Sequence, residues 1–196
     1  MATLTAGRGL LGHAVSYALA SAGQATPQLL PLPTPCDAWD LRTLLLHVSD
    51  SLAVLSEAMR AHHIALAPPP CDEPSADADP LTRLRRQARD LLGACAAGAE
   101  ERLVAIADRE LTTSMVAAAG AIEIAVHGWD ISVACGIRRP IPPDLAAELL
   151  PLAPLLIPRA TRAGLFADPI PAPESAGPSD RLIAFLGRRP RPGGSC

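Results

Sequence analysis

The chain has 196 residues, a formal net charge of −3 and a sequence pI near 5.9. This length fits one domain with an apolar core of its own, and the weak acidic balance provides no basic surface for nucleic acid or for an anionic membrane. Hydrophobic residues make up 49% of the chain and aromatic residues only 3%, so the core must be aliphatic, which favours packed helices over a sheet sandwich.

The cysteines indicate a reducing compartment. There are five of them, an odd number with no CxxC spacing, which is typical of reduced thiols in the cytoplasm. The N-terminus lacks a basic segment followed by a clean apolar run, so no signal peptide is expected. No window of membrane-spanning length is without a charge or a proline. We therefore expect a cytoplasmic protein.

Two helices are predicted in the first third of the chain. Apolar residues recur at helical spacing from Leu4 to about Ala22. The proline-rich segment Pro27–Pro35 cannot be helical throughout and is expected to be an extended connector. Asp40 is a candidate N-cap for a second helix that reaches about His62.

Two further helices are expected after a long loop. The prolines and small polar residues of 68–80 predict a solvated loop. A third helix should run from Pro80 to about Ile106, with Arg83, Arg86, Arg89 and Asp90 on its charged face. After a break at Glu110–Thr113, a fourth helix should cover Ala117–Cys135, ended by Gly136 in a left-handed conformation.

The C-terminal part should contain short helices. A fifth helix at Asp144–Ile157 is interrupted by Pro151 and Pro154 and is expected to be kinked or split. A short helix is predicted at Ser179–Leu186, followed by a flexible Arg/Pro/Gly tail. The predicted fold is all-α: residues 1–165 form a metal-binding helical bundle, and residues 166–196 form a linker, a short helix and a tail.

The fourth predicted helix carries two residues that can share a metal ion. Glu123 and His127 are four residues apart, so a helix places both on one face. This spacing is also common for ion pairs on solvated helices. Here, however, the neighbours are Ile122, Ile124, Ala125, Val126 and Ile131. A buried carboxylate needs a partner, which favours a ligand role.

A third ligand is available on the second predicted helix. His47 lies among leucines and valine, where a lone histidine is more often a hydrogen-bonded core residue than a ligand. Two helices that each place a histidine among aliphatic side chains make a joint metal site more plausible than either histidine alone. Zinc accepts two histidines and a glutamate, and leaves a fourth position for water or substrate.

Several neighbouring residues have two interpretations. Trp39 and Trp129 are expected to anchor packing, although either could line a pocket mouth. Asp130 either orients a metal ligand or makes a local ion pair. Cys36 is interpreted as a small buried thiol, with a lowered pKa as the alternative. His13 is expected to be structural.

Three segments carry a family resemblance. The run Thr34-Pro-Cys-Asp-Ala-Trp-Asp-Leu-Arg-Thr-Leu-Leu-Leu-His47, the run Glu123-Ile-Ala-Val-His-Gly-Trp-Asp130 and the closing Arg181-Leu-Ile-Ala-Phe-Leu-Gly-Arg188 resemble the DinB-like superfamily, in its mycothiol-dependent maleylpyruvate isomerase branch. The resemblance spans nearly the whole chain. It implies a DinB-like four-helix bundle with extra short C-terminal helices.

The resemblance also implies the site and its chemistry. The family's metal ligands fall on His47, Glu123 and His127, which would be both the metal-binding and the catalytic residues. The implied cofactors are a divalent metal, expected to be Zn²⁺, and mycothiol, a bacterial low-molecular-weight thiol. The isomerase itself carries a further C-terminal domain that 196 residues do not accommodate, so maleylpyruvate is not taken as the substrate.

The expected function is that of a metal-dependent thiol S-transferase or isomerase that uses mycothiol on a small organic electrophile, in a setting such as secondary metabolism. The expected partners are this electrophile and the thiol, in a monomer or homodimer. Two alternatives stay open. One is another tailoring enzyme on the same scaffold, a hydrolase or cyclase. The other is a non-catalytic protein that binds a metal or a small molecule.

Overall fold

The structure, a computed structural model, describes residues 6–36, 39–64, 79–97, 100–107, 109–158, 162 and 166–190. The chain divides into two compact units, Met1–Arg139 and Pro140–Cys196. The predicted loop at 68–80 lies outside the described residues except for its last two positions, and Cys71 and Cys196 also lie outside them. The division expected from the sequence, a helical bundle at 1–165 followed by a linker, a short helix and a tail at 166–196, stays a prediction.

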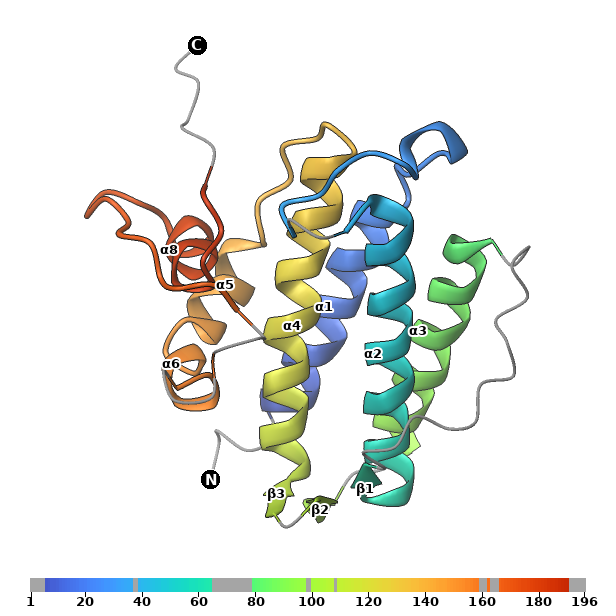
Figure 1. Ribbon diagram of the computed structural model, residues 1–196. Helices are drawn as coiled ribbons and strands as arrows, with labels where there is room; N and C mark the ends of the chain where they lie inside the picture. The colour runs from blue at the N-terminus through green and yellow to red at the C-terminus, as the bar shows by residue number, and fades with distance from the viewer. Residues whose placement is uncertain are drawn as a thin grey trace. The chain divides into compact units, whose positions relative to one another are not determined.

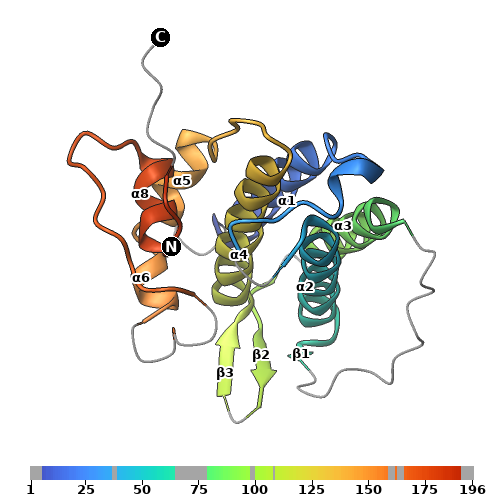
Figure 2. The same ribbon diagram turned by 45° about the horizontal axis from the view of Figure 1, so that its top comes forward.

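Long helices build the first unit. They are α1 (Ala6–Ala22), α2 (Leu41–Ala61), α3 (Pro80–Ala97) and α4 (Thr113–Ala134). The most extensive contacts join α1 to α4 and α2 to α3, and α2 also packs on α4 (Figures 1 and 2). The largest fully buried side chains of this unit are all aliphatic: Leu11, Leu41, Leu44, Leu45, Leu52, Leu84, Leu91, Ile122, Ile124 and Ile131. The predicted all-α bundle with an aliphatic core is confirmed.

The helix α4 lies between α1 and α2, and nearly all of its residues are buried. Among the described residues it is the one helix long and apolar enough to cross a membrane, and 83% of its apolar window is buried inside the protein. Packing against α1 and α2 therefore accounts for its apolar composition.

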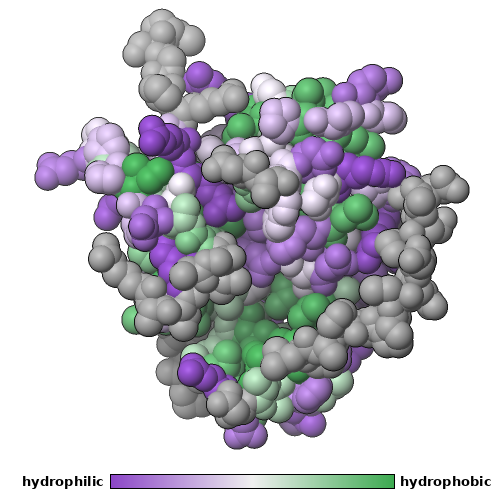
Figure 3. Space-filling view, in the orientation of Figure 1, coloured by the Kyte–Doolittle hydropathy of each residue, from purple (hydrophilic) through white to green (hydrophobic). Residues whose placement is uncertain are grey.

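The outer helix α3 is amphipathic, as its sequence predicts. Leu84, Ala88 and Leu91 are buried, whereas Arg86 and Arg89 are exposed. In Figure 3, hydrophilic residues gather on the upper part of the face over α2 and α3. A charged outer face and an aliphatic inner face are the pattern of a helix that covers a core.

The third helix is shorter than predicted. It ends at Ala97, and the segment expected to be its last turn is the strand β2 (Leu103–Ile106). This strand pairs in parallel with β1 (His63–Ile64) and antiparallel with β3 (Arg109–Thr112), the segment expected to be only a break. The backbone N–H and C=O groups of a strand form hydrogen bonds with other segments of the chain. Helical periodicity within one segment cannot predict these partners.

Local signals predicted the start of α2 and the end of α4 correctly, whereas α4 begins at Thr113 rather than at the predicted Ala117. The Asp40 side chain accepts a hydrogen bond from the Thr43 amide at 2.8 Å and caps α2, as predicted. The Thr43 amide also holds the pKa of Asp40 below its ordinary value. Gly136 has φ of +74° just after α4, the left-handed conformation that ends a helix at low cost in glycine.

Replacing the cap of α2 tests this local account. We expect Asp40→Ala to lower the free energy of unfolding by about 1 kcal/mol, because the Thr43 amide loses its acceptor. Asp40→Asn keeps an acceptor oxygen and should remain close to the wild type at neutral pH. Denaturant unfolding of the three proteins measures the effect, and equal stability of the alanine and asparagine variants would contradict it.

The connector before α2 is not extended throughout. It begins with a 3₁₀ turn at Pro27–Leu29, in which proline occupies the first position, where its missing N–H costs nothing. Pro33 then forms an isolated bridge with Asp40. The Thr34 hydroxyl donates to the Trp39 carbonyl at 2.9 Å and accepts from the Cys36 amide at 3.1 Å. These bonds hold Cys36 and Trp39 in place.

The second unit contains α5 (Pro143–Leu149), α6 (Ala153–Leu156) and α8 (Pro178–Phe185). The predicted fifth helix is thus split around Pro151, as expected. α5 packs on α8, and the Ser179 hydroxyl accepts a hydrogen bond from the Ile141 amide at 3.0 Å.

The beginning of the expected flexible tail is ordered. Arg188 is buried, its guanidinium lies 5.7 Å from the centre of the Phe166 ring, and its amide donates to the Ile183 carbonyl. A guanidinium over an aromatic face is a favourable contact. A charged side chain after the last predicted helix can thus still pack through its planar face, whereas residues 191–196 of the expected tail lie outside the described residues.

Candidate metal site in the bundle

The structure brings His47, Glu123 and His127 together. His47 comes from α2, and the other two come from successive turns of α4. The His47 Nε2 atom lies 3.3 Å from the Glu123 Oε1 atom, and one donor atom from each of the three residues lies within 4.8 Å of the others. The His47 and His127 rings meet edge to face with centroids 5.0 Å apart. The pairing of these residues across two helices is as predicted.

One side of this group is closed and the other is open. His127 is buried, whereas the side chains of His47 and Glu123 are 35% and 36% exposed. The apolar neighbours of Glu123 in the sequence suggested a group sealed within the aliphatic core. The structure shows instead that part of the group is exposed to solvent. A partly exposed edge allows a small molecule to reach the donor atoms from solvent.

Ser51 is a member of the group that the sequence analysis missed. Its hydroxyl donates to Glu123 Oε1 at 2.6 Å. Ser51 follows His47 by four residues on α2, so both face the same carboxylate. The four-residue spacing from His47 was the available signal in the sequence. A role for the serine cannot be inferred from it, however, until the carboxylate of Glu123 is known to face α2.

The surroundings of Glu123 favour its ionised form. Burial by itself would raise the pKa of this carboxyl group, but hydrogen bonds from His47 and Ser51 outweigh burial and hold the pKa below its ordinary value of 4.5. The nearby His127 acts in the same direction. Glu123 is therefore an anionic oxygen donor at neutral pH.

This lowered pKa predicts an acid-dependent stability in metal-free protein. The unfolded chain binds the Glu123 proton more readily than the folded chain, so the contribution of Glu123 is present above its ordinary pKa of 4.5 and is lost as the pH falls through the lower folded value. Unfolding free energies of the wild type and Glu123→Gln should converge in this acidic range. A difference that does not vary with pH would contradict the prediction.

His127 is oriented from its other side by Asp130. Its Nδ1 atom lies 3.1 Å from Oδ2 of Asp130, which is fully buried. A carboxylate can only accept, so this contact places the proton on Nδ1 and leaves the Nε2 lone pair for a cation. Of the two interpretations of Asp130, the structure favours the one in which it orients His127.

Trp39 covers both histidines. Its ring centroid lies 4.4 Å from that of His47 and 6.1 Å from that of His127, tilted in both cases. Trp39 thus restricts the rotation of the two rings as well as anchoring the connector. Trp129, by contrast, is buried and outside the group, as expected of a packing residue.

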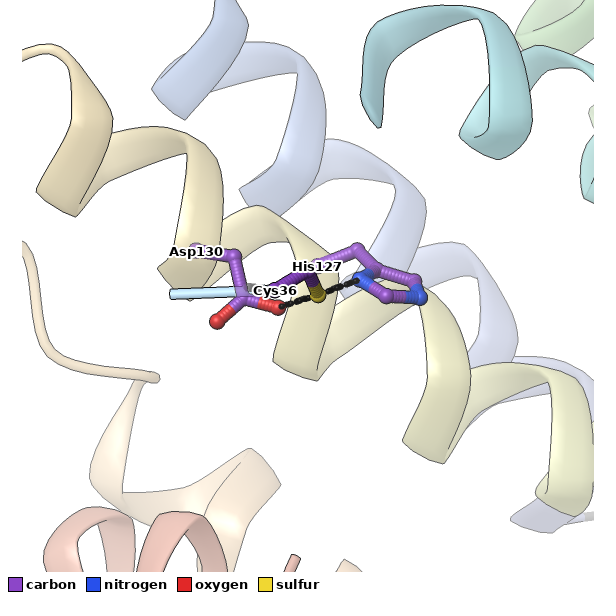
Figure 4. A group of neighbouring side chains, drawn as sticks. All are labelled: Cys36, His127 and Asp130. Carbon is purple, nitrogen blue, oxygen red and sulfur yellow. Dashed lines mark hydrogen bonds and ion pairs between the residues drawn. The ribbon is translucent and has the colours of Figure 1, made fainter. Parts of the chain in front are cut away.

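Cys36 lies next to the orienting carboxylate. Its Sγ atom donates to Asp130 Oδ2 at 3.4 Å and lies 4.0 Å from His127 Nδ1 (Figure 4). The thiol is half-buried rather than enclosed in the core. Among the described residues, His13, His62 and His63 belong to neither group of candidate metal donors; His13 is exposed on α1.

The donor set fits a divalent cation. Two imidazole nitrogens and one carboxylate oxygen are ligands that zinc accepts, at bond lengths that place neighbouring donors roughly 3–3.5 Å apart around a tetrahedral ion. The 3.3 Å between His47 Nε2 and Glu123 Oε1 agrees with this value. His47, Glu123 and His127 are therefore able to hold such an ion without a large rearrangement of α2 or α4.

Comparisons with known proteins agree with this geometry. Residues 11–132 match the family described as the mycothiol maleylpyruvate isomerase N-terminal domain. Two uncharacterized proteins of Mycobacterium tuberculosis, from strains CDC 1551 / Oshkosh and H37Rv, are each 29% identical to the chain over 163 residues, which is 81% of this chain and 85% of each relative. No solved structure matches significantly.

The matched region contains α2 and α3, most of α1 and α4, and each of the candidate ligands. It covers more than half of the chain, and the resemblance seen in the sequence is confirmed. The chain belongs to the mycothiol maleylpyruvate isomerase N-terminal domain family, within the DinB-like superfamily.

Proposed function

We propose that this protein binds one zinc ion through His47, Glu123 and His127 and is an enzyme that transfers or adds a low-molecular-weight thiol, mycothiol, to a small organic electrophile. The observation that carries the proposal is the meeting of these three donors from two helices, in a family related to mycothiol. S-transfer and thiol-assisted cis/trans isomerisation are the two reactions of this class that we expect.

The protein's own residues prepare the site. Ser51 and His47 hold the Glu123 carboxylate in its anionic form, and Asp130 fixes the tautomer of His127. Trp39 covers the two imidazole rings and reduces their contact with water. Preorganised donors of this kind need little rearrangement when substrate arrives.

The cation, when bound, supplies positive charge that stabilises the anionic form of a thiol at neutral pH. The part-exposed edge formed by His47 and Glu123 is the side from which the thiol would approach. With Glu123 committed as a ligand, the group of His47, Glu123 and His127 contains no additional carboxylate to act as a general base. We therefore favour a thiol nucleophile over an activated water.

The proposed partners are small molecules. The net charge of −3 offers no field for nucleic acid or an anionic membrane, and we propose a cytoplasmic monomer or homodimer. A role in secondary metabolism is part of the proposal.

The test is a turnover assay with metal-replete protein. We expect formation of a thioether or an isomerised product, detected by mass spectrometry, from mycothiol and a panel of activated alkenes, epoxides and cis-dienoic acids. His127→Ala should reduce the rate to background, whereas His13→Ala, on the exposed face of α1, should retain it. Metal binding without turnover would favour the non-catalytic binding protein, and turnover with water in place of thiol would favour a hydrolase.

A further inference from the structure

A second group of donor atoms lies on the opposite side of His127. It consists of Cys36 Sγ, His127 Nδ1 and Asp130 Oδ2, and Figure 4 shows the thiol beside the carboxylate and the facing ring nitrogen, with the second ring nitrogen pointing away. Cys36 comes from the connector, whereas the other two come from α4. Sulfur, nitrogen and anionic oxygen are all ligands that zinc and softer divalent ions accept.

The spacing of these atoms resembles that around an ion. The distances are 3.1 Å between nitrogen and oxygen, 3.4 Å between sulfur and oxygen, and 4.0 Å between sulfur and nitrogen. A tetrahedral zinc ion with ordinary bond lengths separates such donors by roughly 3.4–3.6 Å. Each observed distance is within about half an ångström of this range. Small side-chain rotations are therefore sufficient to bring the three donor atoms to bonding distance of one ion.

Charge and access also favour a cation here. Asp130 is fully buried, and a buried carboxylate is stabilised by an adjacent positive charge. A thiolate and a carboxylate together neutralise a divalent ion, whereas Glu123 is the one anionic ligand of the first group. Cys36 is half-buried, which leaves one donor reachable from solvent.

We propose that Cys36, His127 and Asp130 form a second position for a thiophilic divalent cation, and that this position excludes the first. A neutral imidazole offers one lone pair. When an ion binds Nδ1, the imidazole proton moves to Nε2, the atom that the first site needs. The Cys36 thiol loses its proton to solvent as its sulfur binds the ion, so one proton is released for each ion. A soft cation such as Cd²⁺ therefore displaces the resident metal.

The first arm of the experiment removes the first site. In the full chain, His47→Gln and Glu123→Gln eliminate two of its ligands, and Ser replaces Cys71, Cys95, Cys135 and Cys196, so that Cys36 is the remaining thiol. Added Cd²⁺ should give an ultraviolet thiolate-to-cadmium absorption band that saturates at one ion per chain. Adding Cys36→Ser should eliminate the band, and adding Asp130→Asn should weaken binding by about 10-fold or more.

Absence of the band in protein whose helical circular dichroism is intact, or a band that Asp130→Asn leaves unchanged, would overturn the second position. Because this arm lacks the first site, its result is independent of the proposed thiol reaction. If the four serine substitutions reduce folding, the same titration is made on two proteins that keep the other four cysteines, one with Cys36 and one with Cys36→Ser. The difference between their cadmium absorption bands then gives the contribution of Cys36.

The second arm tests exclusion. Zinc-loaded protein with His47 and Glu123 intact, in the same serine background, is titrated with Cd²⁺ while released zinc is measured. We expect the Cys36 band to grow as zinc is released, with about one ion per chain throughout. Growth of the band with zinc fully retained would show two ions bound at once and would overturn the exclusion.

Discussion

In protein that carries Cys36→Ser, which removes a ligand of the second position, replacing His47, Glu123 or His127 by alanine is expected to abolish metal retention while most of the helix content remains. Each change removes one of three donors that lie within 4.8 Å of one another. Loss of a residue that merely orients a ligand already weakens metal binding by roughly 10–100-fold, so loss of a ligand should exceed that factor. Elemental analysis of protein purified under identical conditions, together with circular dichroism, measures both quantities.

His13→Ala is the matched control for these variants, since His13 is an exposed histidine on α1 outside both donor groups. It should keep the full metal content of about one ion per chain. Asp130→Asn should fall between the control and the ligand variants, because His127 remains but loses the carboxylate that orients it. Full metal in protein that carries both His47→Ala and Cys36→Ser would exclude the proposed site, and with it the proposed thiol mechanism, because Cys36→Ser removes a ligand of the second position.

A large loss of stability is expected from a substitution at the glycine of the His127-Gly128 pair. A Cβ atom on Gly128 would lie 2.9 Å from the Tyr17 ring and 3.0 Å from the Ala18 Cα atom of α1. The Tyr17 ring cannot easily move, because it is buried and its hydroxyl donates to the Arg139 carbonyl at 2.7 Å. Gly128→Ala should therefore lower the free energy of unfolding by about 1–3 kcal/mol.

Gly9→Ala is the control for this change. Gly9 lies on the exposed face of α1, and a Cβ atom there meets no other atom within 4 Å. In a helix interior, alanine in place of glycine should stabilise by about 0.5–1 kcal/mol. Denaturant unfolding of the metal-free proteins compares the two variants. If Gly128→Ala is as stable as the wild type, then α1 and α4 are not held at the close distance described here.

A substitution at Gly128 should change the stability of the fold without changing metal binding, although Gly128 lies next to His127 in the sequence. The folded fraction of Gly128→Ala should keep a bound metal ion. The atoms nearest to the new methyl group belong to Tyr17 and Ala18, not to His127 or Asp130. A candidate ligand, His127, and a packing glycine, Gly128, occupy successive positions because α4 lies between two helices. One face of it meets α1, and another meets α2.

The sequence by itself determined what depends on neighbouring residues. Periodic aliphatic residues located the four long helices, a side-chain acceptor marked the start of α2, and Gly136 marked the end of α4. The face shared by Glu123 and His127 follows from helical geometry alone. The motifs that carry the family resemblance are likewise local stretches of sequence, and the family match over residues 11–132 contains the first two of them.

Only the tertiary structure decided what depends on which elements meet. The end of α3 at Ala97 and the pairing of β2 with β1 and β3 rest on hydrogen bonds between distant segments. The approach of Ser51 to Glu123, and of Cys36 to Asp130, joins residues 72 and 94 positions apart. Such contacts are set by how helices and connector pack around a shared core, and periodicity within one segment contains no information about the side chains that another segment brings to it.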